Sequence, residues 1–106
     1  MSDSEKLFWR GVELFNSGAY FEAHEAWEEL WVEASGDERR FLQALIHFAV
    51  GCHHQRKGNS IGAARQWDKG VAKIEPFLPA WRGIHTAPLA VAAKSRSESF
   101  PAIESA

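Results

Sequence analysis

Apolar residues recur at intervals of three and four along most of the chain, and segments rich in glycine, serine and asparagine interrupt them. Such intervals place apolar side chains on one face of an α-helix. They predict four main helices over residues 4–15, 19–34, 38–57 and 60–75. An alanine-rich segment with an early proline predicts a short fifth helix over 86–95. No segment has the alternation of a strand or a hairpin, so the expected fold class is all-α.

Residues that begin helices stand at the predicted boundaries. Ser2 or Ser4 is suited to cap the first helix, and Asp37 to cap the third. Asn59 or Ser60 has the same role before the fourth. We therefore expect two antiparallel helical hairpins, over residues 4–34 and 37–75.

The last third of the chain has weaker signals. Pro76 and Pro79 end the fourth helix, and residues 79–83 have the composition of a turn. The tail is expected to be extended and pinned by Phe100 and Ile103. With 106 residues, the chain is long enough to bury roughly two-thirds of its unfolded surface in one core. Residues 1–106 are therefore expected to form one domain, in which the segment 76–106 closes the two hairpins.

An internal repeat supports the two hairpins. Five residues are matched forty positions later by the same or a similar type: Gly11 by Gly51, Gly18 by Gly58, Phe21 by Ile61, Ala23 by Ala63, and Trp27 by Trp67. The small residues let two antiparallel helices approach, and the tryptophan fills the space one turn later. The pattern resembles tetratricopeptide repeats, whose period is shorter. Two units are too few for an open array, so the C-terminal segment is expected to close the domain.

Composition narrows the classes of function. Five Trp and seven Phe predict an aromatic core with enough surplus for a homodimer interface. The formal charge of −2 gives no positive field for a nucleic acid. A single cysteine, Cys52, excludes an internal disulfide and fits a reducing compartment. No apolar run is long enough to cross a membrane, and residues 1–5 lack the pattern of a signal peptide. We therefore expect a cytoplasmic protein that binds neither nucleic acid nor membrane.

Four segments resemble the bacterial and archaeal family called domain of unknown function 309. They are residues 15–31, with Ala23-His24-Glu25 at their centre, and residues 41–49, 54–63 and 81–84. The resemblance implies a compact helical fold and no particular activity. Two positions depart from the family's pattern, with Ala44 in place of a glycine and His47 in place of a glutamine. His47 is therefore given no family role.

A polar group is predicted between the second and third helices. His24 and Glu28 lie four residues apart at the edge of an apolar arc, and Gln43 and His54 align on one stripe of the third helix. We expect these two pairs to face each other. The carboxylate of Glu25 would then lie at the edge of the group, and the indole of Trp31 would form an apolar wall beside it. The candidate site then comprises His24, Glu25, Glu28, Trp31, Gln43 and His54.

Two of the three interpretations of this group involve no metal. In the first, its members satisfy one another's hydrogen bonds and fix the register of two helices. In the second, they orient a small molecule or a protein partner, with Trp27, Trp31 and Trp67 as apolar walls. We adopt the binding module as the working hypothesis and leave its ligand open.

The third interpretation is metal chemistry. His24, Glu28 and His54 offer three ligands for a divalent metal ion, with a free position for water, as in a metal-dependent hydrolase. The HExxH motif of metalloproteases is absent, because a glutamate stands where that motif has its second histidine. Whether any reaction is catalysed stays open at this point.

Overall fold

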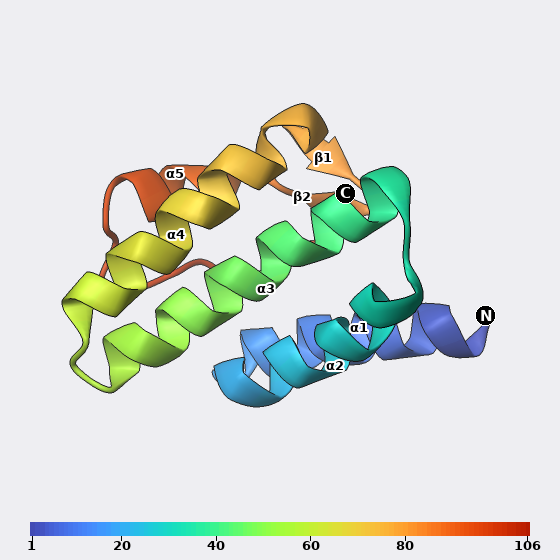
Figure 1. The fold of residues 1–106 in the computed structure, drawn as a ribbon, viewed down its shortest axis with the longest axis horizontal. Coiled ribbons are helices and arrows are strands. Elements are labelled where there is room, and N and C mark those ends of the chain that lie inside the picture. Colours follow the sequence, from blue (N-terminus) through green and yellow to red (C-terminus); the bar gives the residue numbers. More distant parts are fainter.

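The computed structural model describes residues 1–106 and contains five α-helices (Figure 1). They are α1 (Asp3–Asn16), α2 (Tyr20–Glu33), α3 (Gly36–Arg56), α4 (Ser60–Ile74) and α5 (Ala87–Lys94). A 3₁₀ helix (Glu75–Phe77) and two short strands, β1 (Ala80–Trp81) and β2 (Ile84–His85), lie between α4 and α5. The helical fold class and the short fifth helix are thus confirmed.

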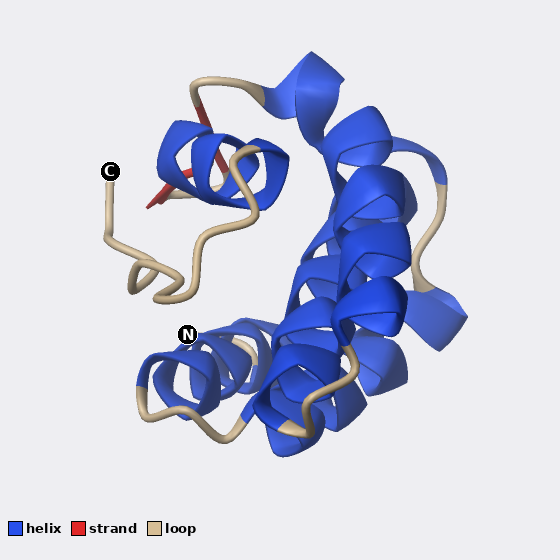
Figure 2. Cartoon of the chain, turned by 90° about the vertical axis from the view of Figure 1, so that its left-hand side faces the viewer, coloured by secondary structure: helices blue, strands red, loops and turns tan.

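The helices form two antiparallel hairpins that lie side by side. α1 packs on α2, α3 packs on α4, and the contact between α2 and α3 joins the two hairpins. In the view of Figure 1, α2, α3 and α4 follow one another across the near face, with α1 behind α2 and α5 behind α4. Figure 2 shows the same arrangement from the side. None of the helices has the length and apolar character needed to span a membrane.

Both hairpins turn in the same way. Gly18 and Gly58 have positive φ angles of 85° and 79°, a backbone conformation that favours glycine. After the first turn, the amide of Ala19 donates a hydrogen bond to the carbonyl of Leu14 at 2.8 Å. After the second turn, the amide of Asn59 donates the equivalent hydrogen bond to the carbonyl of His54, also at 2.8 Å. These bonds satisfy carbonyl groups that the helix end would otherwise leave free, so the repeat extends to the backbone.

Each hairpin is closed by a contact between a glycine and a tryptophan. Gly11 lies against the indole of Trp27, and Gly51 lies against the indole of Trp67. A Cβ atom on either glycine would overlap the ring. The Trp27 indole also donates a hydrogen bond to the carbonyl of Phe8 at 3.2 Å. The small residues therefore do what the repeat predicted, since they let two helices approach across a tryptophan.

The helix starts agree with the expectation at two of three places. Ser2 caps α1 by accepting from the amide of Glu5 at 3.1 Å, and Asn59 caps α4. The prediction of Asp37 as the cap of α3 is wrong. Gly36, with a φ of 58°, turns the chain into the helix one residue earlier. Asp37 instead lies in the first helical turn, where a carboxylate is favourable beside the positive helix end.

The expectation that no hairpin of strands occurs is also wrong. β1 and β2 pair in an antiparallel ladder around Arg82 and Gly83, both of which have positive φ. Two-residue turns of this kind join strands tightly. Each strand has only two residues, too few to show an alternating pattern. The side chain of Arg82 holds the hairpin against the helices, because it pairs with Glu5 and Glu38 and lies 4.3 Å above the ring of Phe8.

The C-terminal tail closes the space between α1 and α3. Ile103 exchanges two hydrogen bonds with the side chain of Asn16, at 2.7 and 3.0 Å. Phe100 stacks on Trp67 at a centroid distance of 5.2 Å and also contacts Phe15 of α1 and Phe48 of α3. This confirms that two large apolar residues pin the tail. Figure 2 shows the tail on the side that Figure 1 hides.

The first prediction concerns the contact between Gly11 and Trp27. Replacing a helical glycine with alanine ordinarily stabilises a helix by about 1 kcal/mol. Here the added methyl group collides with a buried indole, and overpacking costs about 1–3 kcal/mol. We therefore expect Gly11→Ala to lower the free energy of unfolding, measured by urea denaturation. Glu13→Ala, on the exposed side of α1, is the control and should change it little. A more stable Gly11→Ala variant would contradict the packing argument.

Candidate functional site

His24 and Glu28 form a pair on α2. The Nε2 atom of His24 lies 2.5 Å from Oε2 of Glu28, and Nδ1 lies 2.9 Å from the carbonyl oxygen of Phe21. A carbonyl oxygen can only accept a hydrogen bond, so Nδ1 carries a proton. The His24 side chain is 18% exposed and the Glu28 side chain 52%. The pair therefore lies at the surface, and both ring nitrogens are already engaged.

The structure does not bring this pair to Gln43 and His54. Both residues lie half-buried on α3, and neither makes a hydrogen bond to His24 or Glu28. The ring of Phe21 lies at the surface between His24 and α3, since it is 46% exposed and its centroid is 5.0 Å from that of His24 and 5.2 Å from that of His53 on α3. The candidate residues thus share a surface but do not converge into one cluster.

The predicted metal ligands do not form a set. No group of three or more His, Cys, Asp or Glu side chains is arranged to hold a metal ion. His54 lies on α3 apart from the pair on α2, and both ring nitrogens of His24 have other partners. The arrangement of His24, Glu28 and His54 therefore does not support a three-ligand metal site or a hydrolase built on one.

The tryptophans differ in their accessibility. Trp27 and Trp67 are 0% and 2% exposed, so they belong to the helix interfaces. Trp67 reaches only a depression between α3, α4 and the segment after α5, on another side of the molecule from His24 and Glu28. This corrects their predicted role as pocket walls. Trp31 is half-buried, and the guanidinium of Arg39 lies 3.7 Å above its ring centroid. Arginine stacked on an indole makes a favourable contact. Arg39 therefore covers the face of the Trp31 ring, which was expected to form a wall of the candidate site.

His47 has a partner that the sequence did not indicate. Its Nδ1 atom lies 2.8 Å from Oε1 of Gln66 on α4. Burial lowers the pKa of His47, and the nearby Lys73 and Lys69 lower it further, whereas the bond to Gln66 opposes the shift. The imidazole is thus kept neutral at neutral pH. The partner lies on another helix, so no spacing within α3 could have revealed it.

Cys52 packs in the core. It is 1% exposed, and burial raises the pKa of its thiol to about 12, although the nearby Trp67 indole and Arg56 oppose that shift. A nucleophilic cysteine needs an accessible thiolate. Cys52 therefore has neither the access nor the ionisation for such a role.

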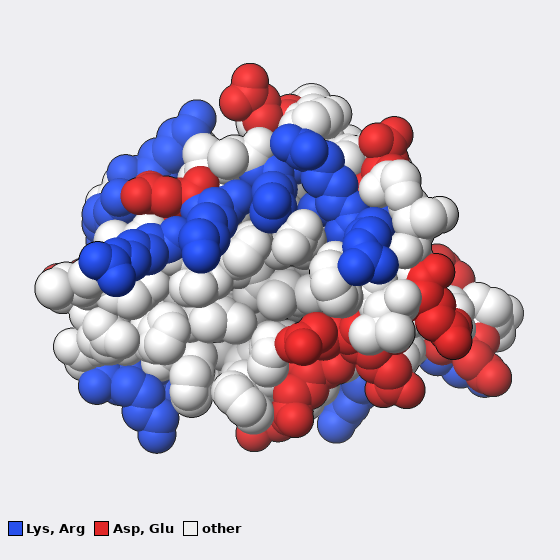
Figure 3. All heavy atoms as spheres, viewed as in Figure 1, with Lys and Arg blue, Asp and Glu red and all other residues white.

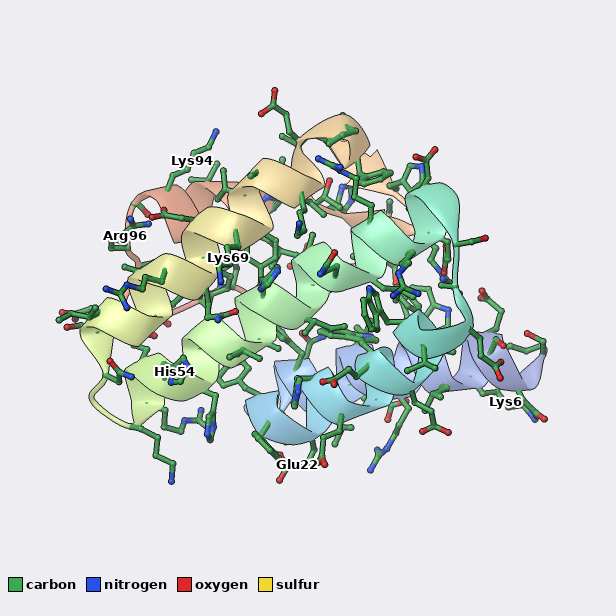
Figure 4. All side chains as sticks on the ribbon, in the orientation of Figure 1. Lys6, Glu22, His54, Lys69, Lys94 and Arg96 are labelled. Carbon is green, nitrogen blue, oxygen red and sulfur yellow. The ribbon has the colours of Figure 1, made fainter.

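The candidate residues lie on a face formed by α2, α3 and α4, which we call the three-helix face. Figure 3 shows basic side chains in a row over α4, acidic side chains gathered over α2, and an uncharged strip between them. Figure 4 shows Lys69 on α4 and His54 on α3 from the same side. Along α3 the strip is half-buried and consists of Gln43, Ile46, His47, Val50 and His54. The face is open and bears opposite charges at its two long edges.

Two antiparallel helical hairpins, each closed by a glycine and a tryptophan, define a small all-α helical-hairpin protein. Residues 8–66 match the sequence profile of the family described as Domain of unknown function (DUF309). The match covers more than half of the chain, so the chain belongs to this family.

A solved structure shares the fold. It is the crystal structure of the conserved hypothetical protein TTHA0068 from Thermus thermophilus, which is 32% identical, with a TM-score of 0.72. The match covers 92% of this chain and 98% of that protein. A search of curated proteins gives no match. Neither the family's description nor that of the solved structure names an activity, so function has to be argued from the surface.

The second prediction follows from the lowered pKa of His47. The unfolded chain takes up a proton near the ordinary value of 6.5, whereas the folded protein does so only at a lower pH. Folding stability is therefore present above pH 6.5 and is lost as the pH falls toward the folded pKa. His47→Gln removes this titration and keeps an amide to pair with Gln66. In urea denaturation at pH 7.5 and 5.5, the unmodified protein should lose more stability on acidification than the variant. Equal losses would contradict the assignment.

Proposed function

We propose that this protein is a non-catalytic module that binds a protein partner through the three-helix face. The observation that carries the proposal is the division of this face into an acidic edge, an uncharged strip and a basic edge (Figure 3). A surface with charges of both signs around a less polar centre has the anatomy of a protein interface, in which the rim is polar.

The shape of the face favours a protein over a small molecule. The depression beside the candidate site is lined by His24, Glu25, Glu28, Glu29 and Val32, which all come from one helix. Small-molecule sites usually enclose most of their ligand between several elements. One side of α2 cannot do so. A macromolecule that lies across three helices needs no such enclosure.

Exposed apolar side chains support the same proposal. Phe21 and Val32 on α2 are 46% and 66% exposed, and they flank the acidic residues of that helix. Apolar residues at an open surface are typical of interaction sites when they form part of a patch. On the opposite side of the hairpins, Phe100 and Ile103 of the tail fill the space between α1 and α3.

The third prediction tests the location of the binding surface. A photo-crosslinking amino acid is placed at Glu28 or Lys69 on the three-helix face, or at the control positions Lys6 on α1 and Lys94 on α5 (Figure 4). After irradiation of cells that naturally make the protein, we expect one discrete protein adduct from the two face positions and none from the controls. Adducts from the control positions alone, or from none of the four, would overturn the proposal.

The same variants separate binding from a purely structural role of the polar pair. Exposed ion pairs contribute at most about 1 kcal/mol to stability. Glu28→Gln should therefore leave the urea midpoint nearly unchanged while it weakens the adduct formed from Lys69. If Glu28→Gln instead lowers stability by about 2 kcal/mol or more and leaves the adduct intact, the pair serves the fold and not the partner.

A further inference from the structure

The two outer helices of the three-helix face carry opposite charges at equivalent positions of the internal repeat. Glu25 and Glu29 of α2 correspond, forty positions later, to Arg65 and Lys69 of α4. All four side chains are exposed. Residues four apart lie on the same side of a helix, so each helix presents a short row of one sign. Glu28 of α2 adds a further carboxylate beside the acidic row, whereas its equivalent on α4, Asp68, is also acidic and pairs with Arg96 at 2.9 Å.

This distribution makes the face its own complement. A two-fold axis along α3 would bring α2 of one copy against α4 of the other, and the reverse contact would form at the same time. Interfaces of this kind use the same surface on both subunits. A rotation about that axis preserves position along the helices, and the repeat places the acidic and basic rows at equivalent positions on their hairpins. Acidic side chains would thus meet basic ones on both sides of the axis.

We infer that the partner of the three-helix face is a second copy of this chain, related by a two-fold axis parallel to α3. The inference rests on the proposed function, because it names the partner of the same surface. A different protein would need one acidic and one basic edge at matching positions. A second copy of this chain already has both edges.

The centre and the size of the face fit such a dimer. The strip that would lie on the axis, from Gln43 to His54, is half-buried and free of lysine, arginine, aspartate and glutamate. Like charges on α3 are therefore confined to its first turns, where Arg39 stacks on Trp31 and Arg40 is exposed. His47 at this strip is held by Gln66. The two longest dimensions of the molecule are 36 and 25 Å. A face of that size accommodates the roughly 800 Å² that each partner of a standard interface buries.

The fourth prediction uses a charge exchange. Glu25→Lys with Glu29→Lys reverses the charge of the acidic row, and Arg65→Glu with Lys69→Glu reverses the charge of the basic row. Sedimentation velocity should show a dimer for the unmodified protein at concentrations up to about 1 mM, where even weak contacts are populated. Each double variant alone should be monomeric, with a dissociation constant raised at least about tenfold by like-charge repulsion.

A mixture of the two double variants tests whether opposite charges on facing edges hold the dimer together. Mixed in equal amounts, they should form a dimer again, since a basic edge then faces an acidic edge on both sides of the axis. Restoration also shows that both variants are folded. Lys6→Glu with Lys94→Glu carries the same change in charge as the acidic double variant but lies outside the face, so it should dimerise like the unmodified protein.

Three results would contradict the inference that the partner is a second copy of this chain. They are a monomer at every concentration, a dimer that the face variants leave unchanged, and a mixture that stays monomeric. Salt gives an independent check, because raising it from 0.1 to 1 M shortens the screening length from about 10 to 3 Å and should weaken a dimer held by charged edges.

The photo-crosslinked adducts show whether only the dimer is wrong or whether the proposed binding surface is wrong as well. If the chain is monomeric but Glu28 and Lys69 crosslink to a different protein, the second copy is wrong and the binding surface stands. If the chain is monomeric and no adduct forms, both proposals fail.

Discussion

The contact between a glycine and a tryptophan, used once in each hairpin, is the constraint on which the rest of this structure depends. Gly11 and Gly51 let neighbouring helices approach so closely that the indoles of Trp27 and Trp67 fill the remaining space. Both indoles are almost fully buried. Because large aromatic side chains carry much of the buried area in a small protein, this contact fixes the distance within each hairpin and adds to the core at the same time.

The two sides of the paired hairpins differ as a consequence. On one side, Phe100 stacks on Trp67, and the side chain of Asn16 binds the backbone of Ile103, so the chain's own tail fills the space between α1 and α3. On the other side, α2, α3 and α4 form the open three-helix face. Closing one side with the tail explains how two hairpins suffice where arrays of such units need more neighbours. It also leaves one broad surface for a partner.

The sequence predicted the helices, the repeat and the role of the tail, because each depends on residue types at regular spacing. It did not predict which side chains stand between the helices. Helical periodicity places His24 and His54 on suitable stripes, but the rotation of α2 against α3 puts Phe21 at the surface between His24 and α3. The bond between His47 and Gln66 and the two-residue strands around Arg82 were missed for related reasons. The hydrogen bond depends on contact between two helices, α3 and α4. The strands have only two residues each, which is too short for an alternating pattern.

The claim that the hairpins are held by interlocked glycine and tryptophan is tested most directly by a double-mutant cycle on Gly11 and Trp27. The indole atoms nearest to Gly11 belong to the five-membered ring, which phenylalanine lacks. Gly11→Ala should therefore destabilise the unmodified protein but be neutral or stabilising in the Trp27→Phe background, where helix propensity contributes up to about 1 kcal/mol. Independent residues would give additive changes. The same effect of Gly11→Ala in both backgrounds, measured by urea denaturation, would contradict the account.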